Sequence, residues 1–148
     1  MKSAVVLFAG VGSTLVMTAF SEAIALVFRK PFHVVTILAI MLPFKKNSES
    51  PGTLMYSIAT VVHYFIGVIF AFAYSLQLSE RLIINDWLSA FLYGGIIASV
   101  AVISWRIFFW IHPNPPPIEL KNYLLTIWGG HIILSLTMAG IFRLFPLS

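Results

Sequence analysis

Two histidines inside long apolar runs are the residues best placed to do chemistry. His63 lies within residues 53–78 and His131 within residues 122–145. An ionisable side chain at that depth in a bilayer is costly unless it faces protein or water. At a rise of about 1.5 Å per residue, the two histidines lie about 15 Å and about 14 Å along helices that run in the same direction. Two imidazoles at one depth favour a shared site that ligates a haem, binds a metal ion or takes up protons.

Glu22 and Arg106 carry opposite charges near the ends of two other apolar runs. They lie about 9 Å and about 8 Å from the same side of the membrane by the same helical rise. Ionisable side chains within a membrane usually pair, so we predict a Glu22–Arg106 ion pair with the histidines just deeper. The sequence thus predicts a buried polar cluster of Glu22, His63, Arg106 and His131. The alternative is purely structural, with a clamp between helices, histidines bonded to hydroxyls or carbonyls, and Arg106 reaching the headgroups.

The composition identifies the class of protein that positions these residues. Of 148 residues, 59% are hydrophobic and 9% are charged, whereas soluble domains carry about 25% charged residues. The net charge of +4 comes from Lys and Arg at the ends of apolar runs, where they act as topology signals and not as a nucleic-acid surface. The absence of cysteine excludes disulfides and thiol chemistry. We expect residues 1–148 to form a single transmembrane domain.

Four apolar runs are long enough to cross a bilayer as helices, which takes about 20 residues. They are residues 3–28, 53–78, 87–111 and 122–145. The segment 31–44 is only about 21 Å long as a helix and has a basic pair on each side, Arg29-Lys30 and Lys45-Lys46. We therefore predict an all-α integral membrane four-helix bundle with an additional short interfacial or re-entrant helix that has Pro31 in its first turn. A fifth span is the alternative.

Small and polar residues at helical spacing predict which face of each span points inward. The predicted faces are Val11, Thr14, Thr18 and Glu22 in the first span; Tyr56, Thr60, His63, Gly67, Phe70 and Tyr74 in the second; Gly95, Ser99, Val102 and Arg106 in the third; and Ile127, His131, Ser135 and Met138 in the fourth. The order Tyr, Thr, His recurs in the second and fourth spans. It suggests a two-fold repeat of parallel helix hairpins, with the segment 31–44 inserted in the first.

Lysines and arginines in the short connections predict the orientation. One side holds Arg29, Lys30, Lys45, Lys46 and Lys121, and the other holds Lys2, Arg81 and Arg143. The positive-inside rule then places the first side in the cytoplasm and both termini outside it.

Several short motifs resemble a known group of proteins. They are Gly10-Val-Gly-Ser-Thr14, Met17, His63-Tyr-Phe-Ile-Gly67 and Tyr93-Gly94. The chain resembles small bacterial four-span membrane proteins grouped in families of unknown function. The resemblance implies a multi-pass protein of the bacterial inner membrane and implies no activity.

We expect no enzyme, because no nucleophile with a base, phosphate-binding loop or HExxH motif is present. The leading hypothesis is a non-catalytic helix bundle, a homo-oligomer or accessory subunit of a larger membrane complex, that binds a hydrophobic cofactor, a lipid or a partner at the polar cluster. A small oligomeric transporter or channel with a His and Glu relay for protons or ions stays open. So do haem b between His63 and His131, in a membrane redox protein, and a metal ion held by the histidines with Glu22.

Overall fold

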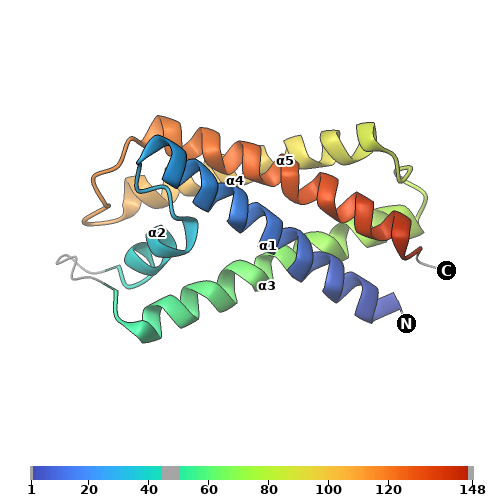
Figure 1. The fold of residues 1–148 in the computed structure, drawn as a ribbon, viewed down its shortest axis with the longest axis horizontal. Helices are drawn as coiled ribbons and strands as arrows, with labels where there is room; N and C mark the ends of the chain where they lie inside the picture. The colour runs from blue at the N-terminus through green and yellow to red at the C-terminus, as the bar shows by residue number, and fades with distance from the viewer. Residues whose placement is uncertain (1, 45–50, 147–148) are drawn as a thin grey trace.

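The computed structural model describes residues 2–44 and 51–146, and every regular element in these ranges is a helix (Figure 1). The helices are α1 (Lys2–Phe28), α2 (Val34–Met41), α3 (Thr53–Ser79), α4 (Trp87–Ile111) and α5 (Leu120–Leu144). All except α2 are long and apolar enough to cross a membrane. Their bounds lie within two residues of the predicted spans, so the four-helix bundle is confirmed.

The long helices alternate in direction along the bundle. Figure 1 shows α1 and α4 running toward the end that holds α2, and α3 and α5 running back toward the end where the chain termini lie. We call these the α2 end and the terminal end. The α1–α3 and α4–α5 hairpins therefore have the same sense, as two parallel repeats would. That they arose by duplication stays a prediction.

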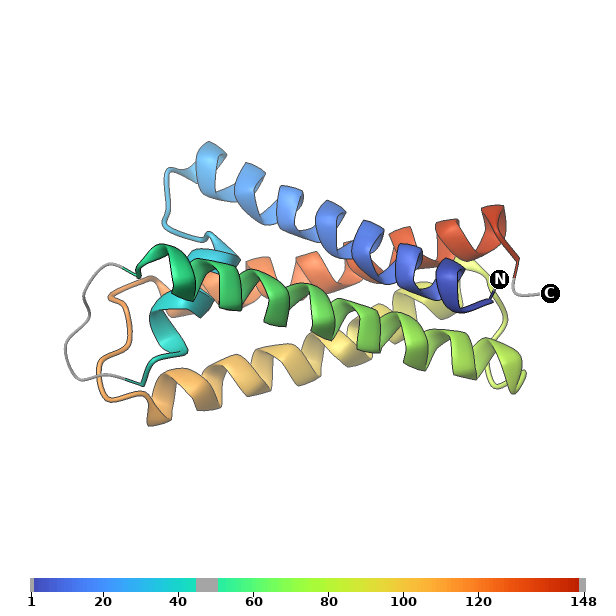
Figure 2. The ribbon, with the colours of Figure 1, turned by 90° about the horizontal axis from the view of Figure 1, so that it is seen from below.

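Three of the four neighbouring pairs of long helices pack closely, and the fourth pair diverges. Helix α1 packs against α3 and α5, and α5 packs against α4. Helices α3 and α4 meet toward the terminal end, where Tyr93 Oη donates to Phe70 O at 3.0 Å and the rings of Tyr74 and Tyr93 lie 5.0 Å apart. From there the two helices separate toward the α2 end (Figure 2).

Small residues allow the close approach of the packed pairs. A Cβ on Gly67 of α3 would overlap Thr14 Oγ1 of α1, and a Cβ on Gly94 of α4 would lie 3.0 Å from Ser135 Cβ of α5. Ser135 Oγ also donates to Ala90 O at 2.7 Å across the α4–α5 contact. Such contacts matter because lipid is as apolar as the helices, so van der Waals packing and hydrogen bonds hold the bundle together.

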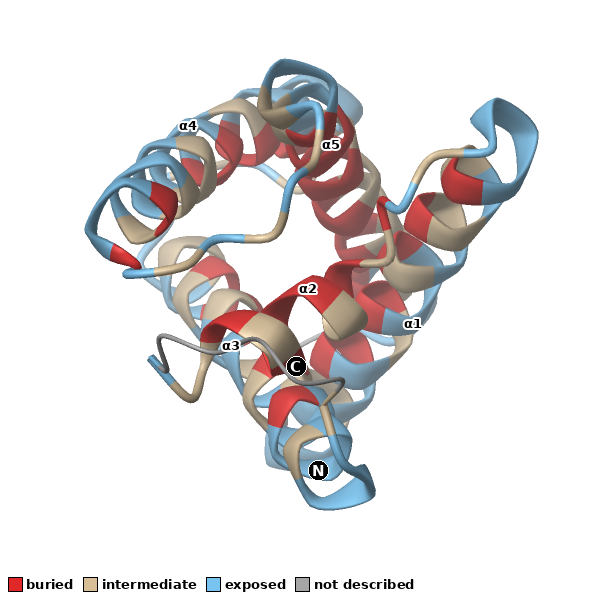
Figure 3. Cartoon of the chain, turned by 90° about the vertical axis from the view of Figure 1, so that its left-hand side faces the viewer, coloured by how far each residue is buried: buried red, intermediate tan, exposed pale blue. Residues whose placement is uncertain are grey.

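The short helix α2 is buried within the α2 end of the bundle (Figure 3). Its eight residues extend about 12 Å, too short for a fifth span. Its buried residues Val34, Ile37 and Met41 belong to the same apolar cluster as residues of α4 and α5. The prediction of a short non-spanning helix is confirmed. However, the helix begins at Val34, so Pro31 precedes it and does not lie in its first turn.

Basic residues lie at both ends of the bundle. Among the described side chains that flank the spans, the α2 end holds Arg29, Lys30 and Lys121, and the terminal end holds Arg81 and Arg143. Lys45, Lys46 and the side chain of Lys2 lie outside the described residues. Which end faces the cytoplasm therefore stays a prediction.

Candidate functional site

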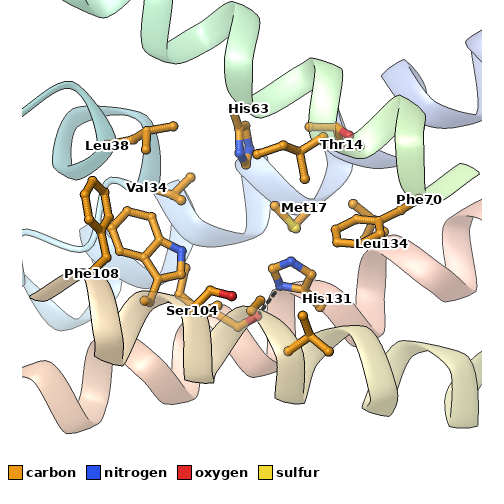
Figure 4. Close-up of a pocket in the computed structure, with 16 residues that line it drawn as sticks. Thr14, Met17, Val34, Leu38, His63, Phe70, Ser104, Phe108, His131 and Leu134 are labelled. Atoms are coloured by element: carbon orange, nitrogen blue, oxygen red, sulfur yellow. Dashed lines mark hydrogen bonds between the residues drawn. The ribbon is translucent and has the colours of Figure 1, made fainter. Parts of the chain in front are cut away.

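A cavity of about 310 Å³ lies where α3 and α4 diverge (Figure 4). All five helices contribute to its wall, which is mostly apolar. The polar side chains of the wall are Thr14, His63, Ser104, Trp105 and His131. His63 from α3 and His131 from α5 project into the cavity from opposite sides, with Met17 of α1 between them in the view of Figure 4. The cavity is thus an apolar chamber with an imidazole on each side.

A hydrogen-bond chain fixes the tautomer of His63. Thr18 Oγ1 donates its only proton to Thr14 O at 2.8 Å, one helical turn back. The same oxygen lies 3.0 Å from His63 Nε2, and while its proton is on Thr14 O it accepts a proton from that nitrogen. Nε2 therefore carries the hydrogen, and in the uncharged ring Nδ1 is the acceptor.

The backbone of α5 fixes the tautomer of His131 in the opposite way. His131 Nδ1 lies 2.8 Å from Ile127 O, and a carbonyl oxygen can only accept, so Nδ1 carries the hydrogen. In the uncharged ring, Nε2 keeps a lone pair that no side chain among the described residues engages by a hydrogen bond. The residue is 7% exposed, and Phe70 packs against its ring with the ring centroids 6.0 Å apart. His131 therefore places a bare acceptor in a buried apolar wall.

The cavity wall favours uncharged imidazoles. None of the residues that line it, all within the described ranges, is acidic. A protonated histidine would have no counter-charge there, and burying an unpaired charge costs far more than burying a neutral ring.

The cavity opens sideways. Of its lining residues, those exposed on the outer surface are Ile66 on α3 and Val100 and Ser104 on α4. We call the edge formed by these three residues the lateral opening. Val34 and Leu38 of α2 are buried and line the cavity on the side of the α2 end. The lateral opening thus lies between the two helices that diverge.

The predicted Glu22–Arg106 ion pair is wrong. Glu22 Oε2 bonds His33 Nδ1 at 2.5 Å, in a pair whose side chains are 42% and 39% exposed. Arg106 is exposed on α4, beside a groove that Lys121 and Trp128 of α5 also line. Equal depth did not bring the two charges together, because α1 and α4 lie on opposite sides of the bundle (Figure 3). The four-residue buried cluster is therefore not formed, and the two histidines line the cavity without Glu22 and Arg106.

The predicted inward face of the third span is also wrong, because the buried residues lie about one position earlier along α4 than the predicted ones. The buried residues of α4 are Ala90, Tyr93, Gly94, Ile97, Ala98 and Phe109. Ser99 and Arg106 are exposed, and a Cβ on Gly95 would meet no atom within 4 Å. The fourth predicted face is correct, since Ile127, His131, Ser135 and Met138 are all buried. In the first two spans the prediction holds for Thr14, His63, Gly67 and Tyr74, but Val11, Tyr56 and Thr60 are exposed.

Sequence reasoning missed the contribution of α4 to the cavity and the partner of Glu22. Ser104, Trp105 and Phe108 line the cavity, yet nothing in an apolar run distinguishes a cavity-facing side chain from a lipid-facing one. The partner of Glu22 is His33, in the connection between α1 and α2. The contact forms because the chain reverses at Arg29, where φ is 51°, and this brings His33 back to Glu22.

Comparison of the chain with protein-family models, with curated proteins and with solved structures found no match.

Proposed function

We propose that this protein is a non-catalytic integral membrane protein that binds a lipid-soluble molecule in the cavity between α3 and α4. The observation that carries the proposal is the lateral opening at Ile66, Val100 and Ser104. In a bundle whose four long helices span the bilayer, an opening between two of them faces lipid. The ligand would then enter from the membrane and not from water.

The shape and composition of the cavity support this proposal. Small-molecule sites are typically cavities of roughly 300–1,000 Å³ with apolar walls and a few placed polar groups. At about 310 Å³ the cavity suits the head of a lipid-soluble molecule, with its chain extending through the lateral opening. Phe70, Leu134 and Phe108 provide apolar wall on three helices, and the two histidines provide the polar groups.

Closure along the bundle axis favours binding over transport. Toward the terminal end, the ring of Tyr74 packs on Tyr93 at 5.0 Å and stacks on Phe142 at 5.9 Å. Toward the α2 end, Val34 and Leu38 of the buried α2 cover the cavity. An ion or a water-soluble solute would have to cross apolar packing at either end, whereas a membrane molecule would meet the opening directly.

The histidines suit a neutral ligand better than a haem or a metal ion. Haem ligation by both imidazoles would require a free nitrogen aimed at the iron from each ring, and the bond of His63 Nε2 to Thr18 leaves only Nδ1, the nitrogen nearer its own helix, on that ring. Among the described residues, no group of three or more His, Asp or Glu side chains could hold a metal ion. Glu22, the expected oxygen ligand, is bonded to His33.

Photolabelling in liposomes tests the proposal. The probe is dodecanol with a diazirine in its chain, which labels whatever side chains surround it. We expect saturable labelling of the cavity residues Met17 and Leu134. The variant Ala101→Trp, which fills the cavity from α4, should abolish that labelling. The matched control Ile103→Trp, on the lipid-facing side of α4 where Ile103 is 59% exposed, should leave it intact.

Labelling that stays on lipid-facing residues, or that is the same in both tryptophan variants, would show that the cavity binds no such molecule.

A further inference from the structure

We infer that the cavity selects lipid-soluble alcohols, with the ligand hydroxyl donating a hydrogen bond to His131 Nε2. The inference rests on the proposed function and names the class of ligand. When one nitrogen of a neutral imidazole donates a hydrogen bond, the other nitrogen can only accept one.

The backbone of α5 determines which nitrogen of His131 donates. Nδ1 lies 2.8 Å from Ile127 O, and the opposite tautomer would set two lone pairs against each other at that distance. The donating nitrogen of His63 is determined as well, because Thr18 Oγ1 gives its proton to Thr14 O and can only accept from His63 Nε2. When uncharged, each ring therefore keeps one nitrogen that accepts and does not donate, and that of His131 is Nε2.

An acceptor that lines a cavity without a protein partner discriminates strongly among ligand head groups. The residue His131 is only 7% exposed, so little water can satisfy Nε2 once a ligand fills the cavity. An ether, ester or ketone head offers only acceptors and would leave Nε2 unsatisfied, which carries the full cost of desolvation. A hydroxyl head donates to Nε2 and removes that cost.

Charged head groups fit the cavity poorly. The lining residues include no Lys or Arg to pair with a carboxylate or phosphate, and no Asp or Glu to pair with an amine. A charged head would therefore be buried without a counter-charge, at a cost that one hydrogen bond does not offset. A neutral molecule with a hydroxyl head and an apolar chain is the class that meets both conditions.

The lateral opening provides a place for the chain of such a molecule. Ile66 and Val100 flank it with apolar side chains, and both are about half exposed, at 42% and 53%. With the hydroxyl at His131, the chain would pass between these two residues into the surrounding lipid. The head would lie in the cavity, and the chain would remain in hydrocarbon throughout.

A matched pair of probes tests the inference on the full-length protein in liposomes. The probes are the diazirine-bearing dodecanol and its methyl ether, which differ in the ability of the head oxygen to donate. We expect the alcohol to label Met17 and Leu134 at a concentration about tenfold lower than the ether, the usual effect of one hydrogen bond to a buried partner. His131→Leu, which conserves bulk but has no acceptor, should bring the two probes to the same half-saturating concentration.

Trp128→Leu is the control, because Trp128 is an aromatic residue on the exposed side of the same helix. This variant should keep the preference for the alcohol. Equal labelling of the wild-type cavity by both probes would overturn the inference and leave the proposed function standing. Failure of both probes to give saturable labelling would overturn the proposed function itself. The comparison in the wild-type protein needs no variant, so it decides the inference even if His131→Leu fails to fold.

Discussion

The α1–α5 contact and the α3–α4 contact are the two contacts between hairpins, and in a symmetric pair of hairpins they would be equivalent. They differ sharply here. A Cβ on Gly130 of α5 would lie 3.1 Å from Met17 Cγ, and a Cβ on Gly12 of α1 would lie 3.4 Å from Ile141 Cδ1, so that contact is closed along much of its length. Helices α3 and α4 meet toward the terminal end and then diverge.

The difference comes from α2, which the first hairpin carries and the second does not. Its buried residues pack against α3 on one side and join the apolar cluster of Phe109, Tyr123 and Ile127 on the other. The helix therefore separates α3 from α4 at the α2 end, and the cavity lies beside it. The short helix α2 thus lies beside a space lined with polar groups at one contact between hairpins, while the other contact is closely packed.

The largest expected difference in stability is between alanine substitutions at the adjacent residues Gly94, on the packed face of α4, and Gly95, on its open face. Gly94→Ala should lower the free energy of unfolding by about 2 kcal/mol, because the new Cβ meets Ser135 Cβ at 3.0 Å and Ile132 Cα at 3.1 Å. Gly95→Ala should raise it by up to about 1 kcal/mol, since nothing lies within 4 Å and alanine favours the helix. Thermal unfolding in detergent compares them. Equal losses would show that α4 is not turned as described.

The next largest loss of stability is expected when the hydrogen bond from Tyr93 to Phe70 is removed, because this bond joins α3 to α4 where they meet. Tyr93→Phe removes the donor to Phe70 O at 3.0 Å and should cost about 1 kcal/mol of stability. The control is Tyr56→Phe, whose hydroxyl makes only a long, exposed bond of 3.5 Å to Thr36. Unfolding of the two variants in the same detergent measures the difference, and a loss as large at Tyr56 would mean that Tyr93 does not hold the pair together.

The smallest expected effect on stability comes from the exposed ion pair between Lys30 and Glu119 at the α2 end. The Lys30 ammonium and the amide of Asn122, both donating to the Glu119 carboxylate, hold the pKa of Glu119 below its usual value. A lowered pKa in the folded state means that this pair stabilises the protein above the usual carboxyl pKa of about 4.3 and is lost as the pH falls through the folded value. We therefore expect Glu119→Gln to flatten the decline of Tm at acidic pH slightly, because the pair is exposed.

The control for Glu119 is Glu80→Gln, an exposed carboxylate at the terminal end of the bundle. Its Tm over the same pH range is the reference against which the profile of Glu119→Gln is compared. Indistinguishable pH profiles for wild type and Glu119→Gln would mean that the Lys30–Glu119 pair contributes nothing to folding.

The spans were predictable because bilayer thickness sets the length of an apolar run, and all four lie within two residues of their predicted bounds. The inward faces of α3 and α5 were predictable from their buried histidines, His63 and His131, whereas Ser99 and Arg106 marked an exposed face of α4. On α4, the residues Gly94 and Gly95 look identical in sequence and lie in opposite environments. Lipid and bundle interior are both apolar, so hydrophobic patterning cannot choose between them.

The ion pair failed for a different reason. Counting residues predicts depth, and it places Glu22 and Arg106 at a similar level. It gives no information on direction around the bundle, which depends on which helices are neighbours. His33 bonds Glu22 because the chain turns back after α1, a contact that depth alone would not select among several residues near the same level.

For a ligand that enters through the lateral opening, affinity is properly expressed as a mole fraction in the membrane. A cavity that fills from the bilayer responds to the mole fraction of its ligand among the surrounding lipids, and not to the concentration in water. A molecule that partitions almost completely into the membrane can therefore occupy the cavity at a low total amount with only a modest intrinsic affinity. Exchange would be a two-dimensional search along the gap between α3 and α4, so the lipid composition around those two helices would set how fast the cavity fills.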